Sequence, residues 1–221
     1  MVFDTNMEML IVYTANFGGK DTVFPEAFVS NQIEYFYFTD LSGEIPNRTV
    51  VKEVSKFDDP IRTAKWYKLH SHVLFPGKTT LWLDANYGLS KTNNILDFAK
   101  NSEDIALQRH HQLPYDEANY CLSSGKVQHV KTFQRQIEFY REQGLPADAP
   151  LYRGGIVLRK PTATSVIFNT LWWDEINRWQ LRDQLSLAYV LWKNNISVSY
   201  LPPKGYYGRR GNHDKHLLPL L

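Results

Sequence analysis

One polar pair in the sequence has the side chains and the spacing to do chemistry. Asp84 and Asn86 follow directly after the apolar residues Leu81 to Leu83 in the stretch TTLWLDANYGL. If the chain stays extended, residues i and i+2 point to the same side, so a carboxylate and an amide oxygen would face one point. Such oxygen ligands suit Mg²⁺ or Mn²⁺. The alternative is that both residues end a strand in an Asx-type turn before Gly88.

A second group of charges lies on a predicted helix. Asp59 and Pro60 have the types expected of a helix cap and a first helical position, and the helix should end before Pro76. Arg62 and Lys65 are three residues apart and therefore share one face of this helix. They could contact a phosphate group, or they could belong to a solvated face.

Strands and helices that would position these residues alternate along the chain. We expect strands within 9–19, 33–40, 79–83, 104–110, 154–160 and 197–203, and helices over 60–75, 130–144, 164–179 and 182–194. This order predicts an α/β fold with a mainly parallel central sheet and helices on both faces. Ligands of such sheets bind beyond the carboxyl ends of the strands. Asn16, Asp40 and Asp84 all fall at predicted strand ends, so they could meet in one crevice.

Length and composition fit one globular domain spanning residues 1–221. The net charge of +2 is too small to indicate nucleic-acid binding. Basic residues do gather in the C-terminal segment 204–221, which is either a solvated tail or a binding segment. Aromatic residues make up 14% of the chain and could form a dense core or a stacking surface; for Trp172 and Trp173 we expect the core.

The single cysteine, Cys121, excludes an intramolecular disulfide, and we expect a buried, inert thiol. The acidic residues Asp4 and Glu8 interrupt the start of the chain, so we expect no secretory signal. No stretch approaches the roughly 20 apolar residues of a membrane-spanning helix, so we expect no membrane anchor. These features favour a cytoplasmic protein.

Several stretches together resemble a known family. They are YTANFGGKD, YFTD, HSHVLFPGKTTLWLDANYGL, RHHQLPYDEANYC, YRGGIVLR and LRDQLSLAYVLWK. Their order and wording are similar to the glycosyltransferase-like domains of bacteria and of plant proteins linked to mucilage and turgor control. The resemblance runs from about Tyr13 to Lys193, and the match over Arg182 to Lys193 is specific. More distantly, the chain resembles family 8 glycosyltransferases, which have the GT-A fold.

The resemblance implies transfer of a sugar from a nucleotide-sugar donor, assisted by Mn²⁺ or Mg²⁺. Asp84, Asn86 and His213 would be the metal ligands, as in the Asp-x-Asp motif and C-terminal histidine of family 8. Asp183 and Gln184 would contact the donor sugar, with Gln184 near the anomeric carbon, which favours retention of configuration. Asp183 could instead be only a helix cap. An inverting enzyme would need a general base, for which Glu117 is the candidate.

Further residues are assigned to donor binding. The full set is Thr14, Ala15, Asn16, Asp40, Arg62, Lys65, Asp84, Ala85, Asn86, Gly154 and Gly155. Gly154 and Gly155 precede a predicted strand, where their small size could let the backbone approach the sugar, although a bulge or turn would also explain them.

The sequence also departs from the family pattern. It has Leu-Asp-Ala-Asn where the family has Ile-Asp-Gly-Asn, and it carries an amide where the Asp-x-Asp motif of family 8 has a second carboxylate. It has HHQLPYDEA in place of a His-Pro form. Two alternatives therefore stay open: a non-catalytic module that binds sugar nucleotides or glycans, and a transferase that acts on modified nucleic acid through the basic C-terminal segment. The acceptor could be a glycan, a protein or a nucleic acid.

Overall fold

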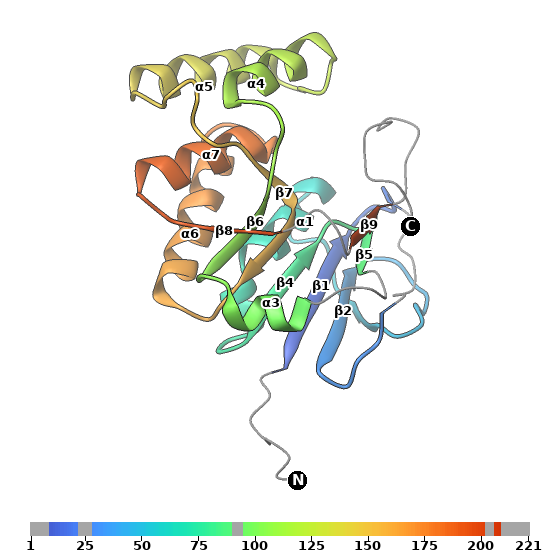
Figure 1. Cartoon of the computed structure of the whole chain (residues 1–221). Coiled ribbons are helices and arrows are strands. Elements are labelled where there is room, and N and C mark those ends of the chain that lie inside the picture. The colour runs from blue at the N-terminus through green and yellow to red at the C-terminus, as the bar shows by residue number, and fades with distance from the viewer. Residues whose placement is uncertain (1–8, 22–27, 90–94, 202–205, 209–221) are drawn as a thin grey trace.

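A seven-stranded sheet runs through the centre of the molecule (Figure 1). The computed structural model describes residues 9–21, 28–89, 95–201 and 206–208. The seven strands are β1 (Leu10–Asn16), β2 (Ile33–Thr39), β3 (Thr49–Lys52), β4 (Thr79–Leu83), β6 (Ile105–Arg109), β7 (Tyr152–Arg159) and β8 (Ser199–Tyr200). Their order across the sheet is β3-β2-β1-β4-β7-β6-β8.

The sheet is mainly parallel, as predicted, and β7 alone runs against its neighbours β4 and β6. The reason lies in the connection from β6 to β7. It contains two helices, α4 (Pro114–Ser123) and α5 (Val130–Glu142), which sit over the edge at which β6 ends (Figure 1). The chain therefore enters β7 from this same edge, which we call the carboxyl edge of the sheet.

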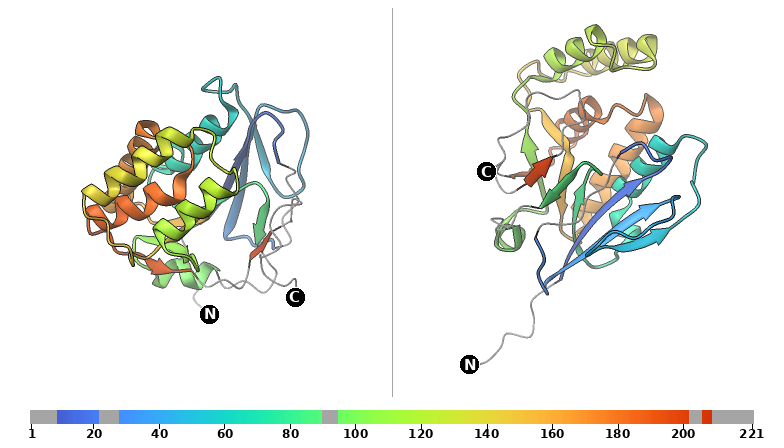
Figure 2. Two further views of the ribbon diagram at one scale, coloured as in Figure 1. Left: turned by 90° about the horizontal axis from the view of Figure 1, so that it is seen from above. Right: turned by 90° about the vertical axis from the view of Figure 1, so that its right-hand side faces the viewer.

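Helices cover both faces of the sheet, as predicted. Those on one face are α1 (Pro60–Leu69), α2 (Ser71–Leu74), α6 (Ala163–Arg178) and α7 (Asp183–Lys193), and α3 (Ile95–Asn101) lies on the other (Figure 2). Alternation along the strands assigns side chains to the two cores: Trp82 packs beneath α1 and α6, whereas Leu81 and Leu83 pack with α3. Both faces of β1 and β4 are buried, which explains their nearly continuous apolar sequences.

A third, smaller core lies between α4, α5 and the outer side of α7. Cys121 and Phe133 are fully buried in it, and Leu185 and Tyr189 contribute from α7. The rings of Tyr140 and Tyr189 stack with centroids 4.0 Å apart. This packing fixes the α4–α5 pair above the start of α7, beside the carboxyl edge.

One local prediction needs correction, and one short strand was not predicted. The helix expected over 60–75 begins as predicted, with the Asp59 side chain accepting from the backbone N–H of Ile61 at 2.8 Å, but it breaks at His70 into α1 and α2. Gly88 lies in β5 (Tyr87–Leu89), which pairs with β9 (Tyr206–Gly208) in an antiparallel ribbon. The C-terminal segment is thus paired to the chain directly after Asn86.

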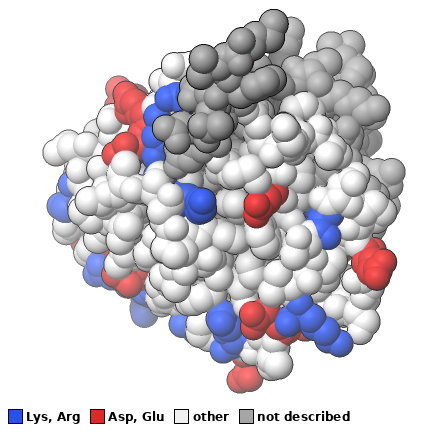
Figure 3. Space-filling model, turned by 90° about the horizontal axis from the view of Figure 1, so that it is seen from below, with Lys and Arg blue, Asp and Glu red and all other residues white. Residues whose placement is uncertain are grey.

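The described residues show how charge is distributed on one face and whether their helices could cross a bilayer. Seen from below, basic and acidic side chains are intermixed on this face rather than gathered in one patch (Figure 3). Within the described ranges, none of the helices has the length and apolar character needed to cross a bilayer.

Candidate active site

Asp84 lies at the end of β4, at the carboxyl edge, with part of its side chain open to solvent. Its Oδ1 accepts a hydrogen bond from Trp82 Nε1 at 2.7 Å, and its backbone N–H donates to the carbonyl of Gly155 at 2.8 Å. Lys68 Nζ is 3.7 Å from the same Oδ1. The side chain is 39% exposed, so the carboxylate is oriented by the protein and still accessible to a ligand.

The chain turns at this point instead of staying extended. The backbone N–H of Tyr87 donates to the carbonyl of Asp84 at 2.8 Å, which closes a four-residue β-turn. The assumption that Asp84 and Asn86 share one side of an extended strand was therefore wrong, and the turn alternative is correct for the backbone. Both residues nevertheless line the same two cavities.

Asp183 is the second carboxylate of the site, and it is held much more tightly. It is the first residue of α7, after the N-cap residue Arg182, so it is not itself the cap. Its Oδ2 accepts hydrogen bonds from Lys65 Nζ and, at 2.7 Å, from Lys68 Nζ. Its carbonyl accepts from Trp172 Nε1 at 3.1 Å. Burial alone would raise the pKa of Asp183, but the two ammonium groups hold the pKa well below its usual range.

Lys68 was not singled out from the sequence, yet it links the two carboxylates. It is 1% exposed, and burial lowers its pKa while Asp183 and Asp84 oppose that shift. Lys65 and Lys68 are three residues apart on α1, so they project from the same face. The signal available in the sequence was this spacing: a second lysine follows Lys65 on the face that carries the apolar side chains.

Gly154 and Gly155 lie inside β7, not before it, and each faces one of the carboxylates. A Cβ on Gly154 would lie 3.0 Å from Lys68 Nζ and 3.3 Å from Asp183 Oδ2. A Cβ on Gly155 would lie 3.2 Å from Asp84 Oδ2. The two glycines therefore keep open the space on which the charged cluster depends.

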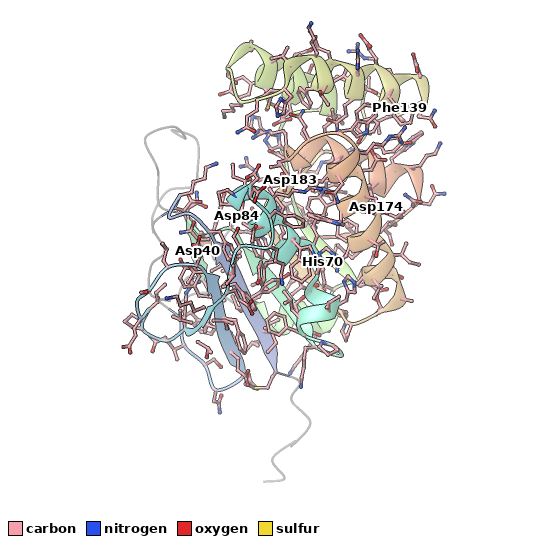
Figure 4. All side chains as sticks on the ribbon, turned by 180° about the vertical axis from the view of Figure 1, so that it is seen from behind. Asp40, His70, Asp84, Phe139, Asp174 and Asp183 are labelled. Atoms are coloured by element: carbon pink, nitrogen blue, oxygen red, sulfur yellow. The ribbon has the colours of Figure 1, made fainter. Side chains whose placement is uncertain are left out.

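Two adjoining cavities meet at Asp84, Asn86 and Lys65. The smaller, of about 210 Å³, lies between the end of β1 and the start of α1. The larger, of about 490 Å³, extends from Asp84 past Gly154 to α4 and the start of α7. Asp84 and Asp183 lie near each other at the centre of this arrangement, below the α4–α5 pair (Figure 4).

The predicted donor-binding residues of β1 and β2 shape the wall of the smaller cavity. Ala15 and Asn16 line it, and the Asn16 side chain donates to the carbonyl of Asp21. Asp40 accepts a hydrogen bond from the backbone N–H of Gly18 at 3.0 Å, so it braces the glycine turn beside the cavity. Thr14 is buried in the strand behind Ala15.

Arg62 and Glu117 have other partners. Arg62 Nη2 donates to Asn177 Oδ1 at 2.7 Å on α6, and Arg62 does not line either of the two cavities. Glu117 lines the larger cavity but is 2% exposed, and its Oε1 pairs with Arg182 and accepts from Cys121 Sγ. Cys121 is buried, as expected, and burial together with this carboxylate raises the pKa of its thiol to about 12.

Two of the remaining predicted residues, Gln184 and Ala85, line the cavities. Gln184 lines the larger cavity, and its Oε1 accepts from Arg182 Nη2 at 3.2 Å. Ala85 lines the smaller cavity. His213 lies outside the described residues. Among the residues that are described, no group of three or more His, Cys, Asp or Glu side chains is placed to hold a metal ion.

Basic and imidazole side chains at the far wall of the larger cavity were missed as functional candidates. His110 follows β6, and Arg153 lies opposite Gln108 in β7. Burial and the nearby Arg153 lower the pKa of His110 to about 4. The sequence did contain a signal, because the His110-His111 pair directly follows a predicted strand end.

Comparisons with known proteins place the chain in a family. A family model described as the TOD1/MUCI70 glycosyltransferase-like domain matches residues 43–201. The probable hexosyltransferase MUCI70 of Arabidopsis thaliana is 30% identical over 159 residues, which are 65% of this chain and 27% of that protein. The chain thus spans about a quarter of the length of this relative.

Two solved structures resemble the fold at low sequence identity. Mouse xyloside xylosyltransferase 1, in its apo form, has a TM-score of 0.48 and 10% identity, with 88% of this chain and 84% of that chain covered. The galactosyltransferase LgtC, in complex with donor and acceptor sugar analogs, has a TM-score of 0.42 and 10% identity, with 83% and 69% covered. On the family match over 43–201, this chain belongs to the TOD1/MUCI70 glycosyltransferase-like domain family.

Proposed function

We propose that residues 1–221 form a single GT-A-like domain that transfers a sugar from a nucleotide-sugar donor to an acceptor hydroxyl, assisted by Mn²⁺ or Mg²⁺. The observation that carries this proposal is the meeting of Asp84 and Asn86 with Lys65 and Asp183 between two adjoining cavities. The cavities open at the carboxyl edge, where α/β sheets bind ligands. The family supplies the reaction class.

The two cavities would hold different parts of the donor. The smaller cavity would take the nucleoside, bounded by Asn16 on β1 and by Pro60 and Ile61 at the start of α1. The diphosphate would lie at Asp84, and the sugar would extend into the larger cavity toward Gly154. Lys65 lines both cavities, so its ammonium group could contact the diphosphate or the sugar.

The residues present fit a metal ion that binds together with its substrate. Asp84 and Asn86 offer two oxygen ligands, and Gly155 leaves space beside Asp84 Oδ2 that a Cβ would fill. Mg²⁺ is commonly bound through one or two carboxylates together with substrate phosphates. A bound ion would act as a Lewis acid on the diphosphate leaving group.

His213 remains our candidate third ligand. Gly208 pairs with Tyr87, three residues after Asp84, and His213 follows Gly208 by five positions in the sequence. The pairing of β9 with β5 thus brings Gly208 beside the turn that follows Asp84, which supports this candidate.

The protein's own charges would stabilise the departing diphosphate. Breaking the anomeric bond adds negative charge to the leaving phosphate, and fixed cations in a partly buried site act on it strongly. Lys65 and Lys68 supply two such cations, and Asp183 holds them in place. We therefore assign Asp183 a positioning role, with Gln184 as the residue nearer the anomeric carbon.

The pairing of the carboxylates favours retention of configuration. An inverting reaction needs a general base beside the acceptor hydroxyl. Of the three acidic side chains that line the larger cavity, Glu117 is paired with Arg182, Asp183 with the two lysines, and Asp84 is our candidate metal ligand. In this arrangement none of the three is assigned to accept a proton from the acceptor.

Two observations favour a second function, in which the site binds a donor without transferring its sugar. Asn86 replaces a carboxylate, and Lys68 Nζ lies 3.7 Å from Asp84 Oδ1, so both reduce the negative charge available to a metal ion. A module of this kind would bind a sugar nucleotide without releasing its diphosphate. The acceptor, a nucleic-acid substrate and the cytoplasmic location stay predictions.

Thermal denaturation with a panel of nucleotide sugars, each with Mn²⁺ or with EDTA, tests the donor. A donor present at 100 times its Kd stabilises the native state by about 2.7 kcal/mol. For a chain of this size the expected increase in Tm is about 5–10 °C. The increase should require Mn²⁺ and should disappear in Asp84→Asn. If no donor raises Tm in either condition, the proposal is wrong.

A further inference from the structure

The larger cavity has a surplus of one positive charge. The ionisable side chains that line it, apart from histidines, are the basic Lys65, Lys126, Arg153 and Arg182 and the acidic Asp84, Glu117 and Asp183. Four basic side chains thus face three acidic ones. A cavity lined in this way attracts ligands with negative charge.

Arg153 is the side chain that carries the surplus. Lys65 is paired with Asp183, and Arg182 with Glu117. Lys126 Nζ lies 4.8 Å from the centre of the Tyr120 ring. Arg153 has no hydrogen bond or ion pair with any residue in the described ranges, although it lines the cavity and is half-buried.

The position of Arg153 places it beyond the metal and diphosphate end of the site. It lies two residues before Gly155 in β7 and lines the same cavity, and an irregularity in the β6–β7 register lies between Arg153 and Val157. Gly155 faces Asp84, whereas Arg153 pairs in register with Gln108 of β6, one strand further along. A ligand that extends from Asp84 toward α4 would therefore reach Arg153 with its sugar portion.

His110 adds a neutral donor beside Arg153. Its Nδ1 is 3.1 Å from the backbone N–H of Gln112 and accepts from it, which assigns the ring proton to Nε2. Burial and Arg153 lower its pKa to about 4, so the ring is neutral near pH 7. A fixed guanidinium fork and an imidazole N–H together match a carboxylate with a neighbouring hydroxyl.

We propose that Arg153 binds the carboxylate of an acidic sugar, so that one of the two sugars handled at this site is a uronic acid. The inference rests on the proposed glycosyltransferase function and names its substrate class. The guanidinium group of Arg153 can bind one carboxylate through two parallel N–H···O hydrogen bonds. The acidic sugar could belong to the donor or to the acceptor.

The test compares acidic and neutral sugars in both roles. Binding of UDP-glucuronate and UDP-glucose is measured by calorimetry, and binding of methyl glucuronide and methyl glucoside to the UDP complex is measured by NMR titration. The proteins are the native chain, Arg153→Gln and the matched control Arg109→Gln. Arg109 is exposed at the end of β6 and does not line the cavity. Unchanged thermal denaturation of both variants confirms that they fold.

We expect the native chain to prefer the acidic member of one pair by about 10- to 100-fold, the range for a hydrogen-bonded charged group. Arg153→Gln should lose the preference while binding UDP as the native chain does, and Arg109→Gln should keep it. The pair that shows the preference identifies the donor or the acceptor as the acidic sugar.

Three results would overturn the inference, and they are distinguishable. Equal binding of acidic and neutral sugars in both pairs rejects the carboxylate site and leaves the transferase proposal intact. Loss of UDP affinity in Arg153→Gln shows that Arg153 binds the diphosphate instead. Failure of the native chain to bind any nucleotide contradicts the proposed function itself.

Discussion

The two aspartates of the site face the same cavity but are held in opposite ways. Asp84 ends a strand, is 39% exposed and accepts one short hydrogen bond from Trp82 Nε1. Asp183 begins a helix, is 11% exposed and shares one oxygen between two lysines. The contrast indicates that Asp84 is available to a ligand, whereas Asp183 is already occupied in organising the cations around it.

Replacing Asp183 by Ala should have the largest effect, and it should act on stability. Without this carboxylate the ammonium group of Lys68 stays buried with only the 3.7 Å contact to Asp84. Breaking a buried ion pair by removing one partner costs about 3–5 kcal/mol. Urea denaturation should show this loss. The control Asp174→Ala, at an exposed position of α6, should change the free energy of unfolding by less than about 0.5 kcal/mol.

Replacing Asp84 by Asn should separate binding from stability. The amide oxygen can still accept from Trp82 Nε1, so we expect a loss of stability below about 1 kcal/mol. The charge that attracts a metal ion is lost, so Mn²⁺-dependent UDP affinity should fall by about 10-fold or more in calorimetry. An Asn variant that binds UDP with Mn²⁺ as tightly as the native chain would show that Asp84 holds no metal.

Replacing Gly155 by Ala tests the space beside Asp84. The new Cβ would lie 3.2 Å from Asp84 Oδ2 and 3.2 Å from the Tyr87 ring, so one of them must shift. Overpacking of this kind costs about 1–3 kcal/mol. We expect reduced UDP affinity together with a lower Tm. Gly125→Ala is an unsuitable control because Gly125 has positive φ, so Ala118→Gly in α4 serves to calibrate a purely structural loss.

The pH dependence of stability tests the neutral state of His110. The pKa of His110 is about 4 in the folded chain, below the usual value of about 6.5, so the unfolded chain binds a proton first as pH falls. Stability is therefore expected to decrease from about pH 6.5 to pH 4. The pKa values of His70 and His72 are lowered too, so His110→Asn should remove only part of the decrease. A pH profile identical to that of the native chain would contradict the assignment.

Local sequence patterns predicted much of the fold. The strand expected over 33–40 is β2, and Asp59 and Pro60 begin α1 as predicted, because caps and strand alternation are set by near neighbours. The break at His70 and the short strands of the β5–β9 ribbon were missed. Each depends on what the backbone packs against or pairs with elsewhere in the chain.

Several residues chosen from the sequence lie together in the structure, but their partners were not predicted. One cavity is lined by Asp84, Asn86, Lys65 and Asp183. Local sequence patterns do not show which of these side chains pair with one another. Lys65 and Asp183 are 118 residues apart in the sequence, and Glu117 and Arg182 are 65 apart. Glu117, the candidate general base, forms an ion pair with Arg182 that no local sequence pattern predicts.

The most direct test of the account is release of nucleoside diphosphate from a panel of nucleotide sugars. The native chain, Asp84→Asn and the control Asp174→Ala would be incubated with Mn²⁺ or with EDTA, and the free diphosphate measured over time. We predict slow release from one donor by the native chain and the control, lost with EDTA and in Asp84→Asn. Tight binding of a donor with no release, even with acceptor sugars present, would contradict a transferase and favour the binding module.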